Sequence, residues 1–138
     1  MKLDIEKIKQ RFSEINESLQ EIRSLTSLDS EEFWAEKRNI AAVKYYLLEA
    51  IEAVGSICTH IVAKKFNRAV STFGECFEIL EEEGIFDKEL AERLKNMAKF
   101  RNKLVHRYWE INDKIVFKYA KEDLKDFIDF MRSIEKLL

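Results

Sequence analysis

Residues 100–109, "FRNKLVHRYW", bring together the side chains in this sequence that are best suited to acid–base and phosphate chemistry. They include Arg101, Asn102, Tyr108 and His106, which is one of only two histidines in the chain. Histidine titrates near neutral pH and can move a proton to or from a hydroxyl, while arginine can hold a phosphate through two parallel hydrogen bonds. These two residue types suffice for metal-free RNA cleavage, in which the 2′-hydroxyl attacks the adjacent phosphate. Asn102 could assist by hydrogen-bonding the phosphate, and Tyr108 offers a further hydroxyl.

The spacing of these residues argues for a site that needs two copies of the chain. On a helix, Arg101 and Tyr108 fall on one face, whereas His106 lies on the adjoining face, about 140° from Arg101. Two such helices meeting near a two-fold axis would bring each arginine and histidine toward its symmetry mate in one composite cleft. The alternative is structural: Arg101 and His106 could instead pair with carboxylates such as Glu49 or Glu52.

A cluster of positive charge surrounds the same stretch. Between Arg93 and Arg107 there are six lysines and arginines and no acidic residue, although the net charge of the chain is −2. That total argues against a generally basic nucleic-acid-binding surface but leaves room for a local patch. The candidate RNA contacts are Lys99, Lys103 and Arg107. The alternative is an ordinary solvated helix face.

Other chemistries find little support. Cys58, His60, Cys76 and His106 are zinc-ligand types, but Cys58 and His60 are two residues apart, about 200° around a helix, and cannot share one ion. The sequence has no glycine-rich phosphate loop and no GxSxG elbow, so we expect neither a metal nor a cofactor. His60 is expected to be a packed or partly exposed helix residue. The two cysteines lack a CxxC pairing and read as reduced thiols of a cytoplasmic protein.

The composition predicts one all-α domain over residues 1–138. Proline is absent and glycine occurs three times, so the commonest helix breakers are nearly missing. We expect an antiparallel bundle of four to five helices, with helices over residues 5–22, 30–66, 67–84, 88–106 and 122–137. Gly84 is expected to end the third helix in a left-handed cap, Asp87 to cap the fourth and Gly55 to mark a kink in the second. Residues 110–120 read as a connector.

The second predicted helix is apolar over more than one face. Its main stripe is widened by Trp34, Ala41, Tyr45, Leu48 and Ile57 beyond what one packed neighbour covers. The excess is explained equally well by a dimer interface and by two covering helices of the same chain. The charged N-terminus lacks a signal-peptide core, and no stretch approaches the roughly 20 apolar residues of a membrane span.

A longer string around the site resembles a known family. "RNKLVHRYWEI" is similar to the pattern R-N-x-L-V-H-x-Y-W-x-I of the HepT-like branch of the HEPN (higher eukaryotes and prokaryotes nucleotide-binding) superfamily. The similarity continues in "CFEILEEEGIFDKELAERLKNMAKF" and "LLEAIEAVGSICTHIVA" and covers roughly residues 40 to 137. Ser56 stands near a position where this branch often has an acidic residue, so an electrostatic role for that acid is not carried over.

The resemblance implies an all-helical homodimer with the R-x4-H elements juxtaposed, in which Arg101 and His106 are the ribonuclease residues. It also implies a toxin–antitoxin pair: a minimal nucleotidyltransferase of the MntA type would adenylylate Tyr108 and silence the nuclease. We therefore predict a metal-independent endoribonuclease toxin that cleaves RNA such as tRNA or mRNA. One alternative is a non-catalytic helical adaptor that binds nucleotide or docks a nucleotidyltransferase. Another is a plain dimerising bundle whose motif is structural.

Overall fold

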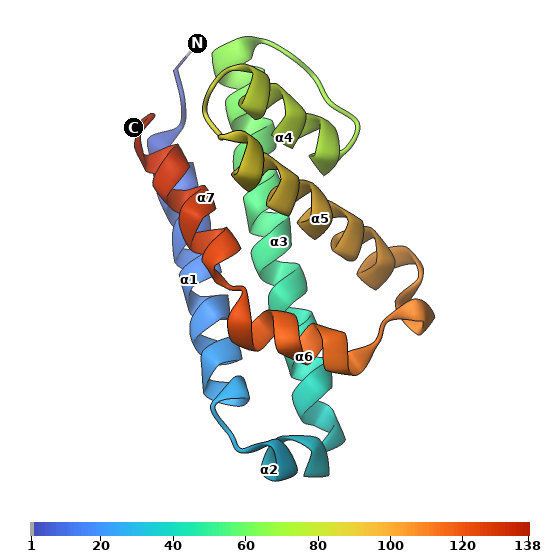
Figure 1. Cartoon of the computed structure of the whole chain (residues 1–138). Helices are drawn as coiled ribbons and strands as arrows, with labels where there is room; N and C mark the ends of the chain where they lie inside the picture. Colours follow the sequence, from blue (N-terminus) through green and yellow to red (C-terminus); the bar gives the residue numbers. More distant parts are fainter. Residues whose placement is uncertain (1) are drawn as a thin grey trace.

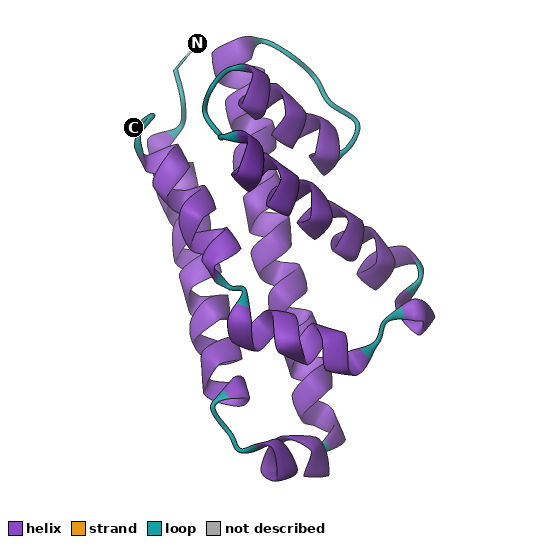
Figure 2. Cartoon of the chain, viewed as in Figure 1, coloured by secondary structure: helices purple, strands orange, loops and turns teal. Residues whose placement is uncertain are grey.

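The computed structural model describes residues 2–138, and helices make up most of this part of the chain, without a strand (Figure 2). The elements are α1 (Ile5–Thr26), α2 (Ser30–Ala35), α3 (Lys37–Phe66), α4 (Phe73–Glu82), α5 (Lys88–His106), the short 3-10 helix η1 (Tyr108–Glu110), α6 (Asp113–Glu122) and α7 (Lys125–Glu135). The predicted all-α bundle is confirmed. The short helices α2 and α6 add to the five predicted ones.

α3 is the central helix of the bundle. It packs against α1 along most of its length and also contacts α4, α5, α6 and α7 (Figure 1). Its main apolar stripe is buried as the periodicity predicts: Ile40, Val43, Leu47, Ile51, Val54, Cys58 and Ile61. Of the residues that widen this stripe, Ile57 is buried by the chain itself, while Ala41 and Tyr45 remain exposed. Helices of the same chain therefore cover only part of the excess apolar surface.

The segment from residue 30 to residue 84 differs from the prediction at its helix boundaries. The expected single helix over residues 30–66 is interrupted at Glu36, whose backbone is extended, and Gly55 lies within α3 without ending it. α3 stops at Asn67, which adopts a left-handed conformation with φ of 51°. The next helix begins only at Phe73, because the Thr72 side chain caps it by accepting from the Glu75 backbone N–H at 3.2 Å.

The predicted connector over residues 110–120 is wrong in its second part, which forms α6. Asn112 caps this helix, and its Oδ1 accepts from the backbone N–H groups of Lys114 (3.0 Å) and Ile115 (3.2 Å). α6 packs on α1 and α3 and buries Val116 and Ala120. Tertiary burial and a good cap thus outweigh the strand preference of the β-branched residues.

The remaining boundaries agree more closely with the sequence. α5 spans the predicted residues 88–106 and is capped by Asp87, whose Oδ1 lies 2.8 Å from the Leu90 backbone nitrogen. Gly84 has the expected left-handed backbone, with φ of 78°. The last helix is shorter than predicted, since α7 begins at Lys125 rather than near residue 122. The helix that carries the candidate site is therefore the best predicted element.

α3 differs from the expectation that no stretch is apolar enough to span a membrane. By length and composition alone it could cross a membrane, and it is the one helix within residues 2–138 that meets these criteria. However, 56% of its most apolar window is buried inside the bundle, as in the core helix of a globular domain. Its hydrophobicity is thus explained by packing against the other helices.

Candidate functional site

The candidate residues lie at the C-terminal end of α5, where the helix leaves the core. Leu90, Leu94 and Met97 bury the first part of α5 against the bundle. The helix ends at His106, and Arg107 has non-helical φ and ψ of −143° and 46°. The motif therefore combines a packed helix that fixes Arg101 with a less covered end that presents His106.

Arg101 is oriented by three hydrogen bonds. Its Nε donates to Glu52 Oε1 at 2.6 Å, Nη2 donates to Glu52 Oε2 at 3.5 Å, and Nη1 donates to Asn102 Oδ1 at 3.3 Å. The pairing with Glu52 confirms part of the structural alternative, but the pair is not in the core: 25% of the Arg101 side chain and 45% of the Glu52 side chain are exposed. A guanidinium has five N–H donors, so one N–H on each of Nη1 and Nη2 is left for an anion.

Phe73 and Gly55 complete the surroundings of Arg101 and were not identified as site residues from the sequence. The Arg101 Cζ atom lies 5.0 Å from the centroid of the Phe73 ring, a cation–π geometry. The same ring covers Gly55 of α3. The one signal in the sequence is the glycine within a long helix, which indicates either a kink or a close approach.

His106 lies away from Arg101 on the same helix. Its side chain is exposed in the last turn of α5, and within residues 2–138 no hydrogen bond or ion pair engages its ring, including with Glu49 or Glu52. Five residues along a helix separate the two groups by about 7.5 Å of rise and about 140° of rotation. One chain therefore does not bring them to a common face.

Tyr108 is placed differently from the helical-wheel prediction. Because α5 ends at His106, Tyr108 and Trp109 lie in η1 and not on the Arg101 face of the helix. Tyr108 is 68% exposed and Trp109 69%, and the two rings contact edge to face with centroids 5.6 Å apart. The Tyr108 side chain is thus largely exposed to solvent.

The cations of α5 divide into two groups. Arg93 pairs with Asp126 at 2.6 Å and Asp129 at 3.0 Å, and Lys95 pairs with Glu81 at 3.2 Å. Lys99 and Lys103 are exposed and have no carboxylate partner in the part of the chain that the structure describes. Arg107, four residues further on, lies 3.7 Å from Glu110.

The unpaired cations share a face with the histidine. On a regular helix the residues at positions 99, 102, 103 and 106 fall within an arc of about 100°. These residues are Lys99, Asn102, Lys103 and His106, all exposed. This arc, which we call the basic face of α5, combines positive charge with a titratable group.

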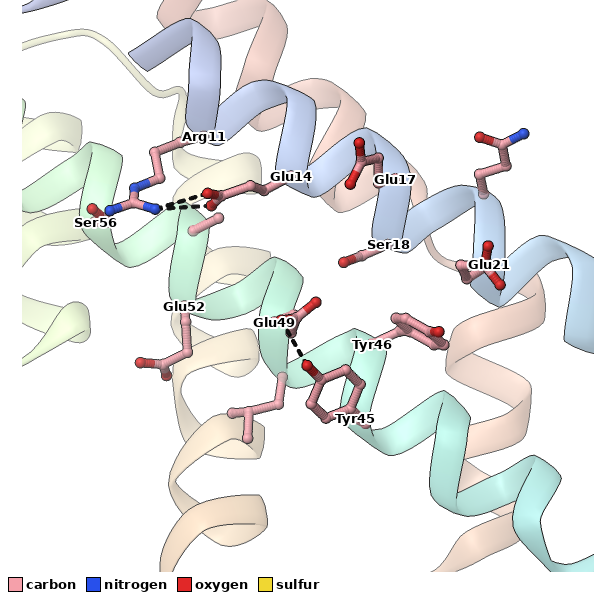
Figure 3. A pocket seen from close by; sticks show the side chains of 13 residues that line it. Arg11, Glu14, Glu17, Ser18, Glu21, Tyr45, Tyr46, Glu49, Glu52 and Ser56 are labelled. Atoms are coloured by element: carbon pink, nitrogen blue, oxygen red, sulfur yellow. Dashed lines mark hydrogen bonds and ion pairs between the residues drawn. The ribbon is translucent and has the colours of Figure 1, made fainter. Parts of the chain in front are cut away.

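A groove on the α1 side of α3 has the opposite charge. It is a groove of about 810 Å³ between α1 and α3, which we call the acidic groove (Figure 3). Its charged lining consists of Glu14, Glu17, Glu21, Glu49, Glu52 and a single arginine, Arg11. Arg11 is itself bonded to both oxygens of Glu14, at 2.9 and 3.0 Å. This lining would repel a phosphate backbone.

The other candidate metal ligands are separated from the site. No group of three His, Cys, Asp or Glu side chains within residues 2–138 has a geometry that could hold a metal ion. Cys58 and Cys76 are free and buried, and their hydrogen bond lowers the pKa of Cys76 to about 7. His60 is partly exposed and its Nε2 accepts from the Asp4 backbone N–H at 2.9 Å, at the start of α1. These residues serve helix contacts.

A protein family model and a curated protein that match this chain are both described as ribonucleases. A family model described as ribonuclease HepT-like matches residues 15–134. A curated protein of Archaeoglobus fulgidus, named "Putative RNase", is 33% identical over 99 residues, which cover 72% of this chain and 74% of that protein.

Solved structures share the fold closely. A tri-AMPylated HEPN toxin of Shewanella oneidensis in complex with its MNT antitoxin is 25% identical, with a TM-score of 0.86 over 94% of this chain and 97% of that chain. A toxin–antitoxin complex with AMP-PNP has a TM-score of 0.87 at 24% identity, over 95% and 98% of the two chains. YutE of Bacillus subtilis is 18% identical with a TM-score of 0.82, over 99% and 91%. The last two show the fold alone.

Proposed function

The chain belongs to the ribonuclease HepT-like family, and we propose that it is a metal-independent endoribonuclease that acts as the toxin of a cytoplasmic toxin–antitoxin pair. The observation that carries the proposal is the state of the two reactive groups. Arg101 is held by Glu52 and Asn102 with two donors left, and His106 is exposed on the same helix. An acid–base group must be free to meet a substrate, and the exposed His106 ring meets this requirement.

In the proposed reaction His106 moves protons and Arg101 stabilises the phosphate. A histidine acting as base takes the proton of the 2′-hydroxyl, and the 2′-oxygen forms a bond to the adjacent phosphorus. The bond from phosphorus to the 5′-oxygen breaks, and a histidine acting as acid protonates that oxygen, which leaves a 2′,3′-cyclic phosphate and a 5′-hydroxyl. The free Nη1 and Nη2 donors of Arg101 offset the charge that develops on the phosphoryl oxygens, with Asn102 assisting.

The site requires a homodimer in this proposal. One chain holds Arg101 and His106 about 140° apart around α5, so a second α5 across a two-fold axis must supply the complementary group. The exposed apolar residues Val105 and Tyr45 lie on α5 and α3 and offer contact area for such a copy. The basic face, with Lys99 and Lys103, and the adjacent Arg107 would then guide the RNA backbone toward the composite cleft.

Tyr108 is the proposed regulatory residue. A nucleotidyltransferase partner of the MntA type would transfer an adenylyl group from ATP to the Tyr108 oxygen, releasing pyrophosphate. The exposure of Tyr108, and the AMPylated state of the related Shewanella oneidensis toxin, support this assignment. An adenylate two residues after His106 adds a bulky anion that would compete with RNA phosphates for Arg101 and the basic face.

The test is an RNA cleavage assay with protein purified away from any partner, in the presence of EDTA. We expect the wild-type chain to cleave RNA, the His60→Ala variant to remain active, and His106→Ala to be inactive because its acid–base group is gone. Mass spectrometry of the products should show cyclic phosphate ends. Equal cleavage by wild type and His106→Ala would contradict the proposal.

A further inference from the structure

The Arg101 guanidinium is hydrogen-bonded along its edge by two polar side chains and also lies over one aromatic ring. Glu52 and Asn102 accept hydrogen bonds from its edge and so set the direction in which its donors point. Their bonds leave the group free to tilt out of plane. The Phe73 ring, 5.0 Å from Cζ to its centroid, limits that tilt, since a guanidinium stacks favourably on an aromatic ring.

Phe73 reaches Arg101 because residue 55 of α3 has no side chain. A Cβ at Gly55 would overlap the Cζ, Cε1 and Cε2 atoms of the ring. Gly55 follows Glu52 by three residues, so the ring and the carboxylate lie on neighbouring parts of one face of α3. Glycine is unfavourable in a helix interior, and close approach of Phe73 is the physical reason for it here.

The backbone beneath Phe73 is also held in place. Phe73 is the first residue of α4, directly after the cap Thr72, and Glu75 accepts in return from the Ser71 backbone N–H at 3.1 Å. This reciprocal arrangement resembles a capping box, with the N–H of the residue before the cap as the donor to Glu75. One turn further on, the Cys76 sulfur contacts Thr59 Oγ1 of α3 at 3.5 Å. The ring is therefore presented from a fixed helix start and not from a loose loop.

We propose that Phe73, seated on Gly55, is a positioning residue that sets the tilt of the Arg101 guanidinium and so aims its two free donors at the scissile phosphate. The proposal rests on the ribonuclease function proposed above. Phe73 acts through Arg101 and takes no part in bond making. Its contribution follows from orientation: small misplacements of a transition-state contact are costly in rate.

The test uses single and double substitutions with a matched glycine control. Gly55→Ala adds one methyl group where the ring sits, and Phe73→Leu removes the ring. We expect each to lower kcat about 10-fold with KM within about 2-fold, because a transition-state contact is misaligned while ground-state binding is kept. The control is Gly74→Ala, whose Cβ would meet only Thr72 Oγ1 at 3.9 Å and should leave cleavage unchanged.

The double variant Gly55→Ala/Phe73→Leu separates positioning from general damage. If the added methyl acts only by displacing the ring, the double variant cleaves as fast as Phe73→Leu alone, because the shorter leucine clears the methyl. Additive losses, a loss of kcat that merely follows the fraction of unfolded protein, or wild-type rates in both single variants would overturn the proposal.

A readout without RNA keeps this test distinct from that of the function. The Nε–H signal of Arg101 in an NMR spectrum senses the ring current of Phe73, so it should shift in Gly55→Ala and Phe73→Leu and stay in place in Gly74→Ala. An unshifted signal in both site variants would overturn the positioning role. Absence of cleavage by the wild type would instead refute the ribonuclease function and leave the NMR result to decide the positioning.

Discussion

The two halves of α5 carry similar cations and use them differently. In the first half Arg93 and Lys95 are bound to carboxylates of α7 and α4. In the second half Lys99 and Lys103 face solvent, and no carboxylate within residues 2–138 pairs with them. Arg101 lies at the boundary, since Glu52 and Asn102 together take three of its five N–H groups and leave one on each of Nη1 and Nη2. The role of each cation is thus set by the elements that face it, not by its residue type.

The same boundary separates the acidic groove from the basic face. Glu52 lines the groove between α1 and α3 and also pairs with Arg101 of α5. RNA phosphates would be repelled on one side of this pair and attracted on the other. We expect the first half of α5 to hold the fold and the second half to hold the substrate, and substitutions in each half can separate these roles.

The largest effect is expected for Arg101→Ala in the second half. Loss of the phosphate contact should lower kcat/KM by about 100- to 1,000-fold, as for removal of other preorganised transition-state donors. The free energy of unfolding should fall by no more than about 1 kcal/mol, since the ion pair with Glu52 is partly exposed. Cleavage kinetics and urea unfolding measure the two. A large stability loss with a proportionate loss of rate would mark Arg101 as structural.

A loss of stability without a loss of cleavage rate is expected for Asp126→Ala, which removes a partner of Arg93 in the first half of α5. Asp126 is buried and accepts from Arg93 at 2.6 Å and from the Tyr119 hydroxyl at 3.0 Å. Its removal leaves the Tyr119 hydroxyl without this acceptor and Arg93 with Asp129 as its remaining close partner in α7. The free energy of unfolding should fall by about 2 kcal/mol, because two hydrogen bonds to a buried carboxylate are lost. Where the variant is still folded, cleavage per molecule should stay within about 2-fold of wild type. A variant that is stable but inactive would contradict the division.

An intermediate effect is expected from Lys99→Gln/Lys103→Gln on the basic face. Loss of two phosphate contacts should weaken RNA binding and reduce the slope of log Kd against log salt by about 1.4. The control is Lys95→Gln, because Lys95 is already paired with Glu81 and should contribute little to RNA binding. Fluorescence anisotropy at several salt concentrations distinguishes them. If Lys95→Gln weakens RNA binding as much, per lysine replaced, as the double variant does, the pairing of a lysine does not decide its role.

The smallest effect is expected from the other histidine, outside α5. Burial, reinforced by the nearby Lys7 charge, lowers the pKa of His60 below its usual value, and its Nε2 accepts from Asp4 N–H only when unprotonated. Below about pH 6.5 the unfolded chain therefore binds more protons than the folded chain, and stability falls as the pH drops. Tm should decline between pH 7 and pH 5 less steeply in His60→Gln than in wild type. If Tm declines equally with pH in both proteins, His60 does not cause the loss of stability at low pH.

Local signals in the sequence were sufficient for much of the fold. The cap at Asp87, the left-handed Gly84 and the buried stripe of α3 follow from residue types and spacing alone. α6 could not be predicted in this way, because "KIVF" favours a strand and becomes helical only through burial against α1 and α3. The break between α2 and α3 at Glu36 could not be predicted either, because no glycine or proline marks it in the sequence.

The candidate site, like the fold, could be predicted from the sequence only in part. Arg101 and His106 stand out by type and spacing, and the pairing of Arg101 with Glu52 was among the alternatives. The contact of Phe73 with Arg101 joins residues 28 positions apart on two helices, and no periodicity within one helix encodes it. The prediction that Tyr108 shares a helix face with Arg101 is wrong, because it assumed that the helix continues to Tyr108, whereas α5 ends at His106.

The central claim is that the site is complete only across two chains, and subunit mixing tests it most directly. Arg101→Ala and His106→Ala chains are each expected to be inactive alone. When the two are unfolded together and refolded, about half of the dimers are mixed, and each mixed dimer should contain one intact arginine–histidine pair. We predict recovery of about a quarter of wild-type cleavage. No activity beyond that of the separate variants would contradict the account.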